Sequence, residues 1–351
     1  MIEILLTRPD GTYLLPVERV EWKGAKYRAP RSIQVELISS SKGLHRPVIM
    51  DEGDAVMFRW KGIELFRGIV FSRSFSMDDR MTFTAYDNLY YLVNNTDSQV
   101  FTNQKASDML KRLCQEFQVQ MGNIADTQFV KKKQINEDDT PYEMVLMALD
   151  TTYKQLGTRY TIRSRQGKVE LQANTKNIHN WIIEKGVNLT GYNYSTSIEE
   201  TVTRVKMRSG SEEKTITVQA DNAAAQKKYG ILQLLETVSE DLNKAQLQQR
   251  ANQTLSNKGK VNKSFSIESI GITDAVSGAG IHVIIPERGI KKGYYIEEDT
   301  HTFEAHDYTM SLTLSETDDL PEIDEDIDIS NGTSKKKEDT FAEDLREEIR
   351  G

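Results

Sequence analysis

The sequence has very few cysteines and no long apolar segment. Cys114 is the single cysteine among 351 residues, so no disulfide can form within the chain and paired C-x-x-C motifs are excluded. No run approaches the roughly 18 consecutive apolar residues of a membrane span, and the N-terminus lacks the basic and apolar regions of a signal peptide. We therefore expect a protein that is made in a reducing cytoplasm and has no membrane contact as an isolated chain.

The common sequence signatures of catalysis are also missing. The chain contains no G-x-S-x-G, no G-x-x-x-x-G-K-[ST] and no H-E-x-x-H. Adjacent acidic pairs occur at Asp78-Asp79, Asp138-Asp139 and Glu199-Glu200, but neighbouring carboxylates diverge, whereas glycosidase carboxylates face each other across about 5–10 Å. The sequence therefore predicts no catalytic residue, no cofactor and a protein that is not an enzyme.

Three weaker candidates for chemistry have simpler structural explanations. His301 and His306 are the only close histidines, and a spacing of five on one strand places them on opposite faces, so we expect no metal site there. Cys114 lies in a stripe of Met and Leu, which favours a buried, inert thiol over a nucleophile. Tyr86 and its neighbours Tyr90-Tyr91 could form a sugar-stacking platform, but ordinary packing is the favoured explanation.

Charge is distributed unevenly along the chain. The net charge is -8, and residues 316–351, with fourteen acidic and five basic side chains, carry -9 of it, so the remaining 315 residues sum to +1. A nearly neutral body argues against nucleic-acid binding, which needs a basic face. The acidic segment is typical of a solvated tail.

Residues 1–95 alternate between apolar and polar side chains, as half-buried strands do. One run contains Ile33, Val35 and Leu37, and later runs cover 56–60, 66–71 and 81–86. Turn signals separate such runs, at Pro9-Asp10-Gly11, Lys23-Gly24, Glu52-Gly53-Asp54 and Lys61-Gly62. This spacing predicts an antiparallel barrel or sandwich.

Residues 96–175 show the helical period and predict a small α/β domain. Lys105–Phe117 has an apolar stripe, with Thr102 or Asn103 available as the N-cap. A second helix is predicted to begin at Thr140-Pro141-Tyr142-Glu143, which has capping-box spacing and proline at N1, and to end near Gly157. Strand-like segments follow at 160–162 and 169–171.

Residues 176–315 return to strand patterns and predict a second β-barrel with a helical insertion at about 221–257. The expected strands are 181–183, 201–207, 265–272, 282–285, 293–297 and one long alternation from His301 to Leu314. One inserted helix is expected from Asp221 to Gly230 and another within 240–257. The predicted fold class is thus α+β, mainly β, with two antiparallel barrels around an α/β domain.

Several strings in this order resemble the XkdQ/YqbQ family of baseplate hub proteins from defective prophages and phages of Gram-positive bacteria, over roughly residues 20–315. They are EGD at 52–54, LFRGIV at 65–70, AYDNLYYL at 85–92, NQKAS at 103–107, DDTP at 138–141, GKVEL at 167–171, YGILQ at 229–233 and THTF at 300–303.

The resemblance implies a structural hub of a contractile phage tail or tail-like particle, located in its baseplate and made in the bacterial host cytoplasm. Such hubs carry two tail-tube-like barrels per chain. They assemble as homotrimers that join the hexameric tail tube to the trimeric central spike. Implied partners are the spike, the tube or tube-initiator protein, the tape-measure protein and other baseplate proteins. Two other functions stay open: a tail-associated peptidoglycan hydrolase, and the hub of a long non-contractile tail.

The chain departs from the family pattern after Leu314, where it continues as an acidic tail at 316–351. Its end has a capping box from Thr340 to Glu343 and predicts a short amphipathic helix. Phe341, Leu345 and Ile349 form the apolar stripe of that helix, and we expect them to bind a partner chain.

Overall fold

The computed structural model describes all residues except 40–47, 78, 175–177, 212–213, 239–241 and 318–351. The chain divides into two compact units. The first unit contains residues 1–192 and everything from Ser266 onward, and the second contains Asn193–Phe265. No helix in the described residues is both long and apolar enough to cross a membrane.

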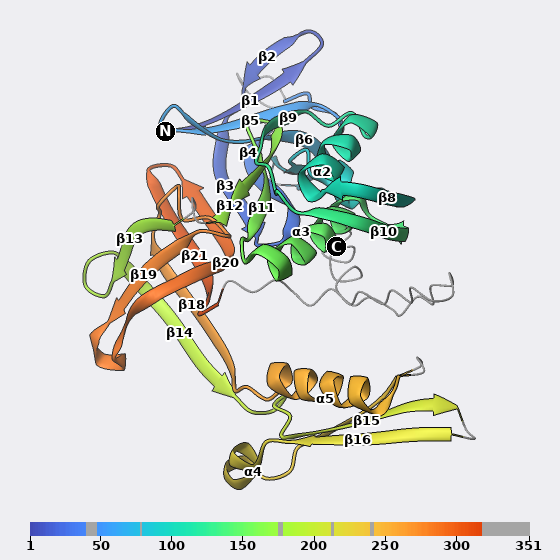
Figure 1. Cartoon of the computed structure of the whole chain (residues 1–351). Coiled ribbons are helices and arrows are strands. Elements are labelled where there is room, and N and C mark those ends of the chain that lie inside the picture. Colours follow the sequence, from blue (N-terminus) through green and yellow to red (C-terminus); the bar gives the residue numbers. More distant parts are fainter. Residues whose placement is uncertain (40–47, 78, 175–177, 212–213, 239–241, 318–351) are drawn as a thin grey trace. The chain divides into compact units, whose positions relative to one another are not determined.

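A 13-stranded, mostly antiparallel sheet dominates the first unit (Figure 1). Its strands come from both ends of the chain. The N-terminal set is β1 (Ile2–Arg8), β2 (Gly11–Leu14), β3 (Val17–Ala25), β4 (Arg28–Ile38), β5 (Ala55–Trp60), β6 (Ile63–Phe75) and β7 (Arg80–Tyr86). The C-terminal set is β13 (Ile178–Glu184), β14 (Leu189–Ser197), β18 (Asn262–Ile270), β19 (Gly280–Ile285), β20 (Ile290–Glu304) and β21 (Asp307–Ser315), with a short 3₁₀ helix at Pro286–Arg288.

The two strand sets join where β3 pairs with β20, from Ala25 opposite Glu298 to Arg19 opposite Glu304. The strand order is β14-β18-β21-β20-β3-β4-β7-β6-β5-β1-β2, with β19 beside β20 and β13 beside β19. The mainly β prediction is confirmed. In the described residues the strands follow one open path and do not close into two rings, so the two-barrel architecture is not confirmed.

The N-terminal strands bury the residues that their alternation predicted. Ile33, Val35 and Leu37 on β4 are fully buried, with polar residues between them. The C-terminal set also contributes to this core, because the Phe303 ring of β20 packs 4.9 Å from Phe58 and 5.1 Å from Trp60. The hydrophobic core therefore spans both strand sets.

Between β7 and β13 lie helices and two small sheets. The helices are α1 (Tyr90–Val93), α2 (Ala106–Glu116) and α3 (Pro141–Leu156), and the strands are β8 (Asp97–Lys105), β9 (Met121–Ile124), β10 (Val130–Asp139), β11 (Tyr160–Arg165) and β12 (Lys168–Ala173). The capping box at Thr140 and the stop at Gly157, which is left-handed, are both confirmed. The predicted cap of α2 at Thr102 or Asn103 is wrong, because both residues lie in β8 and the N-cap is Lys105.

The second unit is a three-stranded sheet with two helices. Its strands are β15 (Arg204–Ser211), β16 (Lys214–Asp221) and β17 (Gln233–Val238), in the order β16-β15-β17. Helix α4 (Ala223–Tyr229) is capped by Asn222 and ends at Gly230, and α5 (Lys244–Lys258) has a capping box at Asn243. Both helices occur where the sequence predicted them, to within a few residues.

The long strand predicted from His301 to Leu314 is wrong, since the chain reverses there. β20 ends at Glu304, β21 begins at Asp307, and Phe303 pairs with Tyr308 across the hairpin. Ala305 adopts a φ of 45° at the turn. No glycine or proline marks this position, so the alternation of two antiparallel strands resembled a single strand.

Candidate functional site: the junction of β3 and β20

A buried ion pair lies at the join between the two strand sets. The Asp299 carboxylate of β20 is inaccessible to solvent, and the Arg31 guanidinium of β4 reaches it across β3. Arg31 Nη1 lies 2.9 Å from Asp299 Oδ1, and Nη2 bonds Oδ2. The pairing is bidentate, the geometry in which arginine binds a carboxylate most strongly.

Further groups form hydrogen bonds within this cluster. The backbone N–H of Ser277 donates to Asp299 Oδ1 at 2.6 Å, and Arg31 also donates to the Ser277 hydroxyl at 3.2 Å. On the other side of the guanidinium, the Trp22 ring stacks at 4.3 Å. Two segments that are distant in sequence from Asp299 thus satisfy one buried charge, as buried charges require.

His301 continues this polar cluster along β20. Its Nε2 lies 3.2 Å from Asp299 Oδ2 and its Nδ1 lies 2.8 Å from the Tyr308 hydroxyl, while the ring is fully buried beside Trp22. His306 is exposed in the hairpin turn. Residues 301 and 306 therefore do not form a pair, as expected, although they lie on a hairpin and not on one strand.

The electrostatics keep Asp299 ionised. Burial alone would raise the pKa of this carboxyl, but the positive charge of Arg31 and the contacts with His301 and Arg31 outweigh burial and hold the pKa well below its usual value. The cluster is therefore a charged structural junction over the pH range in which proteins are normally handled.

Gly24 makes room for this arrangement. It lies within β3 opposite Asp299, and a Cβ at this position would overlap the Arg31 guanidinium. The sequence prediction that Lys23-Gly24 marks a turn is wrong, because the chain reverses two residues later. Gly24 is required here because the Arg31 side chain packs closely against the strand. From sequence alone, a glycine required for close packing looks the same as a glycine in a turn.

A second buried carboxyl lies near the junction on the far side of Arg31. Asp87 accepts backbone N–H bonds from Arg31 at 3.2 Å and from Leu89 at 2.9 Å. Complete burial raises the pKa of Asp87 to about 7, with the two N–H groups and the Arg31 charge opposing the shift.

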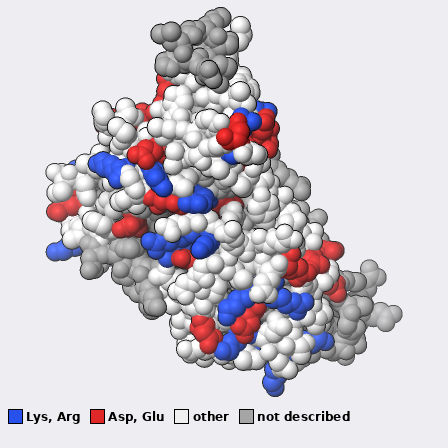
Figure 2. All heavy atoms as spheres, turned by 90° about the horizontal axis from the view of Figure 1, so that it is seen from above, with Lys and Arg blue, Asp and Glu red and all other residues white. Residues whose placement is uncertain are grey.

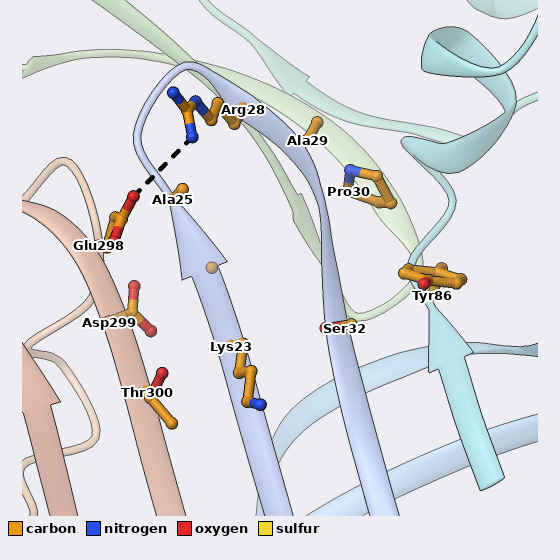
Figure 3. A pocket seen from close by; sticks show the side chains of 11 residues that line it. Lys23, Ala25, Arg28, Ala29, Pro30, Ser32, Tyr86, Glu298, Asp299 and Thr300 are labelled. Atoms are coloured by element: carbon orange, nitrogen blue, oxygen red, sulfur yellow. Dashed lines mark ion pairs between the residues drawn. The ribbon is translucent and has the colours of Figure 1, made fainter. Parts of the chain in front are cut away.

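A shallow pocket of about 270 Å³ opens beside the junction (Figure 3). Its lining comes from β3, β4, β20 and the end of β7: Lys23, Gly24, Ala25, Arg28, Ala29, Pro30, Ser32, Tyr86, Glu298, Asp299 and Thr300. Arg28 and Glu298 face each other at its rim, with 3.9 Å between Nη1 and Oε1. The lining contains neither histidine nor cysteine, so Ser32 has no imidazole base within this pocket.

The other candidates from the sequence occupy structural positions. Cys114 is buried in α2, as predicted, and burial raises the pKa of its thiol to about 12. Tyr86, Tyr90 and Tyr91 do gather with Phe71, but the rings pack edge-on or tilted against one another and present no flat platform. In the described part of the chain, no three His, Cys, Asp or Glu side chains gather as metal ligands.

The predicted partner-binding residues Phe341, Leu345 and Ile349 lie outside the described residues. Arg31, Asp299 and Gly24 were not predicted from the sequence to form one cluster. An isolated Arg and Asp so far apart in sequence give no local signal.

A family model and two relatives match most of this chain. The YQBQ-like family model matches residues 20–315. The YqbQ protein of Bacillus subtilis is 44% identical over 324 residues, covering 92% of this chain and 99% of that protein. The phage-like element PBSX protein XkdQ of the same organism is 41% identical with the same coverage.

Solved structures share the fold at low identity. A 43 kDa tail protein of prophage MuSo2 from Shewanella oneidensis is 15% identical with a TM-score of 0.66, covering 89% of this chain and 98% of that one. The Escherichia coli c3393 protein, a type VI secretion component described as similar to the T4 tail proteins gp27 and gp5, is 11% identical with a TM-score of 0.51, covering 86% and 73%. The fold is shared with a phage tail protein and with a type VI secretion component. The chain belongs to the YQBQ-like family, which confirms the family resemblance.

The buried ion pair predicts a large penalty for removing one partner. Replacing Arg31 by Met leaves Asp299 charged and uncompensated, so we expect the free energy of unfolding to fall by about 3–5 kcal/mol. The control Arg67→Met breaks the exposed pair with Glu64, 2.9 Å apart, and should cost at most about 1 kcal/mol. Urea unfolding curves measure both losses, and similar small values would contradict the assigned role of the pair.

The pKa of Asp87 predicts a pH-dependent stability. Between pH about 4 and 7 the folded protein retains a proton that the unfolded chain releases, so each pH unit gained lowers the free energy of unfolding by up to about 1.4 kcal/mol. Asp87→Asn should remove this slope and gain stability relative to wild type as the pH rises. Unfolding titrations from pH 4 to 8 test this, and a constant difference between the two proteins would contradict it.

Proposed function

We propose that this chain is the structural hub of a contractile tail baseplate or tail-like particle. In this proposal it is a homotrimer that joins the hexameric tail tube to the trimeric central spike. The N-terminal and C-terminal strand sets would each present one tube-like, barrel-type unit, so three chains would offer six such units to the tube.

The observation that carries the proposal is the continuous sheet through β3 and β20. A hub that matches two symmetries must keep its two strand sets at a fixed spacing while the tail contracts. Hydrogen bonds from residue 19 to residue 25, together with the buried Arg31–Asp299 pair, hold the sets in one register. A flexible linker between two independent domains would not provide that constraint.

The proposed domain organisation follows the sequence. Residues 1–95 form the first barrel unit, 96–175 the α/β domain, 176–315 the second barrel unit with its insertion, and 316–351 the acidic tail. The proposed partners are the spike, the tube or tube initiator, the tape-measure protein and other baseplate proteins. On the face seen in Figure 2, basic and acidic side chains are interspersed, which supports protein partners over nucleic acid.

The same proposal assigns no catalytic role to the chain. The lining of the pocket beside the junction contains no histidine or cysteine, Arg28 pairs with Glu298 at its rim, and Asp299 is engaged by Arg31. The rival functions are a peptidoglycan hydrolase and the hub of a long non-contractile tail. A zymogram on bacterial cell walls tests the first, and neighbouring genes for a sheath test the second.

The hub proposal predicts a trimer in solution. Light scattering on purified full-length protein should give three times the chain mass of 40.0 kDa, and electron microscopy of intact particles should place three copies between tube and spike. The zymogram of the same preparation should stay free of lysis. A monomer within particles, or clear lysis, would contradict the proposal.

We further propose that the helix predicted at the end of the acidic tail binds a neighbouring baseplate chain through Phe341, Leu345 and Ile349. Replacing all three by Ser should reduce spike or tape-measure attachment at least tenfold, as measured by their amounts in purified particles. The control replaces Asp344 and Glu347, which helical spacing places outside the predicted apolar stripe, by Ser. Normal particle composition with the apolar triple variant would refute this role for the helix.

A further inference from the structure

The ribbon formed by β8 and β10 has one covered face. Gln134 and Asn136 of β10 are buried on that face, and Gln134 Nε2 donates to the Met144 carbonyl of α3 at 2.8 Å. The other face is open to solvent in the described structure. There Val100 of β8 lies directly opposite Ile135 of β10, with exposed fractions of 53% and 39%.

One edge of β10 is unpaired as well. Among the described strands, β10 pairs with β8 alone, so its opposite edge presents backbone N–H and C=O groups to no strand. Such an edge is a template for a further strand. At ten residues, β10 is long enough to bind an extended segment over several hydrogen bonds.

Lysines determine which strand can bind there. Lys131, Lys132 and Lys133 follow one another in β10, and Lys131 Nζ bonds the Thr151 hydroxyl at 2.9 Å. Lys132 and Lys133 are exposed and form no ion pair with any described residue. Lysines on an edge repel neutral or basic strands. For the same electrostatic reason they favour an acidic one.

The chain itself contains a segment of that character beyond Thr317. Residues 322–329 read EIDEDIDI and alternate with period two. One face carries Ile323, Glu325, Ile327 and Ile329, and the other carries acidic residues alone. This pattern is that of a strand with one apolar and one charged face.

We propose that residues 322–329 add as a third strand to the free edge of β10, with Glu325 opposite Lys133. Isoleucines flank Glu325 two residues away on both sides. An isoleucine therefore lies next to Ile135 whether the added strand is parallel or antiparallel. On the other face, Lys132 then lies opposite Asp324 or Asp326, again for either direction.

This register satisfies three requirements together. The apolar pair Val100–Ile135 gains an apolar neighbour on the open face, the two free lysines gain carboxylates, and the unpaired edge gains hydrogen bonds. The proposed contact lies within one chain and does not involve Phe341, Leu345 or Ile349. Its test therefore does not depend on the hub proposal.

Hydrogen exchange tests the proposal on the intact protein. We compare the full chain with a chain ending at residue 317, following the β10 amides that point away from β8. These amides should exchange at least tenfold more slowly in the full chain, and the protection should shrink at high salt because the pairing is ionic. Equal exchange in the two chains would overturn the proposal.

A charge swap tests the register. Lys133→Glu and Glu325→Lys should each lose the protection, and the double variant should restore it. Lys168→Glu, an exposed lysine at the start of β12, is the matched control and should leave β10 protected. Loss of protection in the double variant, with β8 exchange unchanged so that the ribbon is folded, would refute the Glu325–Lys133 register.

Discussion

The Asp299 carboxylate is fully buried, and the architecture of the first unit depends on the groups that neutralise its charge. Arg31 arrives from β4, the Ser277 amide from the segment before β19, and His301 from β20 itself. A buried ion pair adds little net stability compared with apolar packing, because desolvation offsets most of the attraction. It is nevertheless very selective, since a sheet register that separates the partners leaves a bare charge in the core.

That selectivity explains how strands from opposite ends of the chain pair in one arrangement. Buried residues of β3 and β20 alternate with more accessible ones, and a slip of two residues would preserve this alternation. Such a slip would move Asp299 away from Gly24, the glycine of β3, where a Cβ would overlap the guanidinium. The junction also orients the α/β segment, because the turn after β3 supplies Tyr27, whose hydroxyl receives a hydrogen bond from Asn174.

Local physics made much of the fold predictable. The capping box at Thr140, the left-handed Gly157 and the alternation of Ile33, Val35 and Leu37 each act over a few residues, and the structure has them as predicted. The Arg31–Asp299 pair was not predictable, because its two partners meet only after the chain between them has folded. The tight hairpin at Ala305 was missed for a different reason: its turn lacks glycine and proline, and two strands with matched alternation look like one.

Strand edges are where the proposed assembly contacts are expected. At the junction, the buried carboxylate is fully engaged within the chain, so a partner could bind there only by breaking those bonds. Strand edges that no described strand pairs with lie elsewhere, at β2 and β10. The outer strand β2 is only four residues long yet exposes Tyr13 and Leu14, by 45% and 65%, and β10 offers a longer edge beside exposed cations. A protein whose interior fixes its own register can recognise its neighbours through such edges without changing the sheet that joins its two halves.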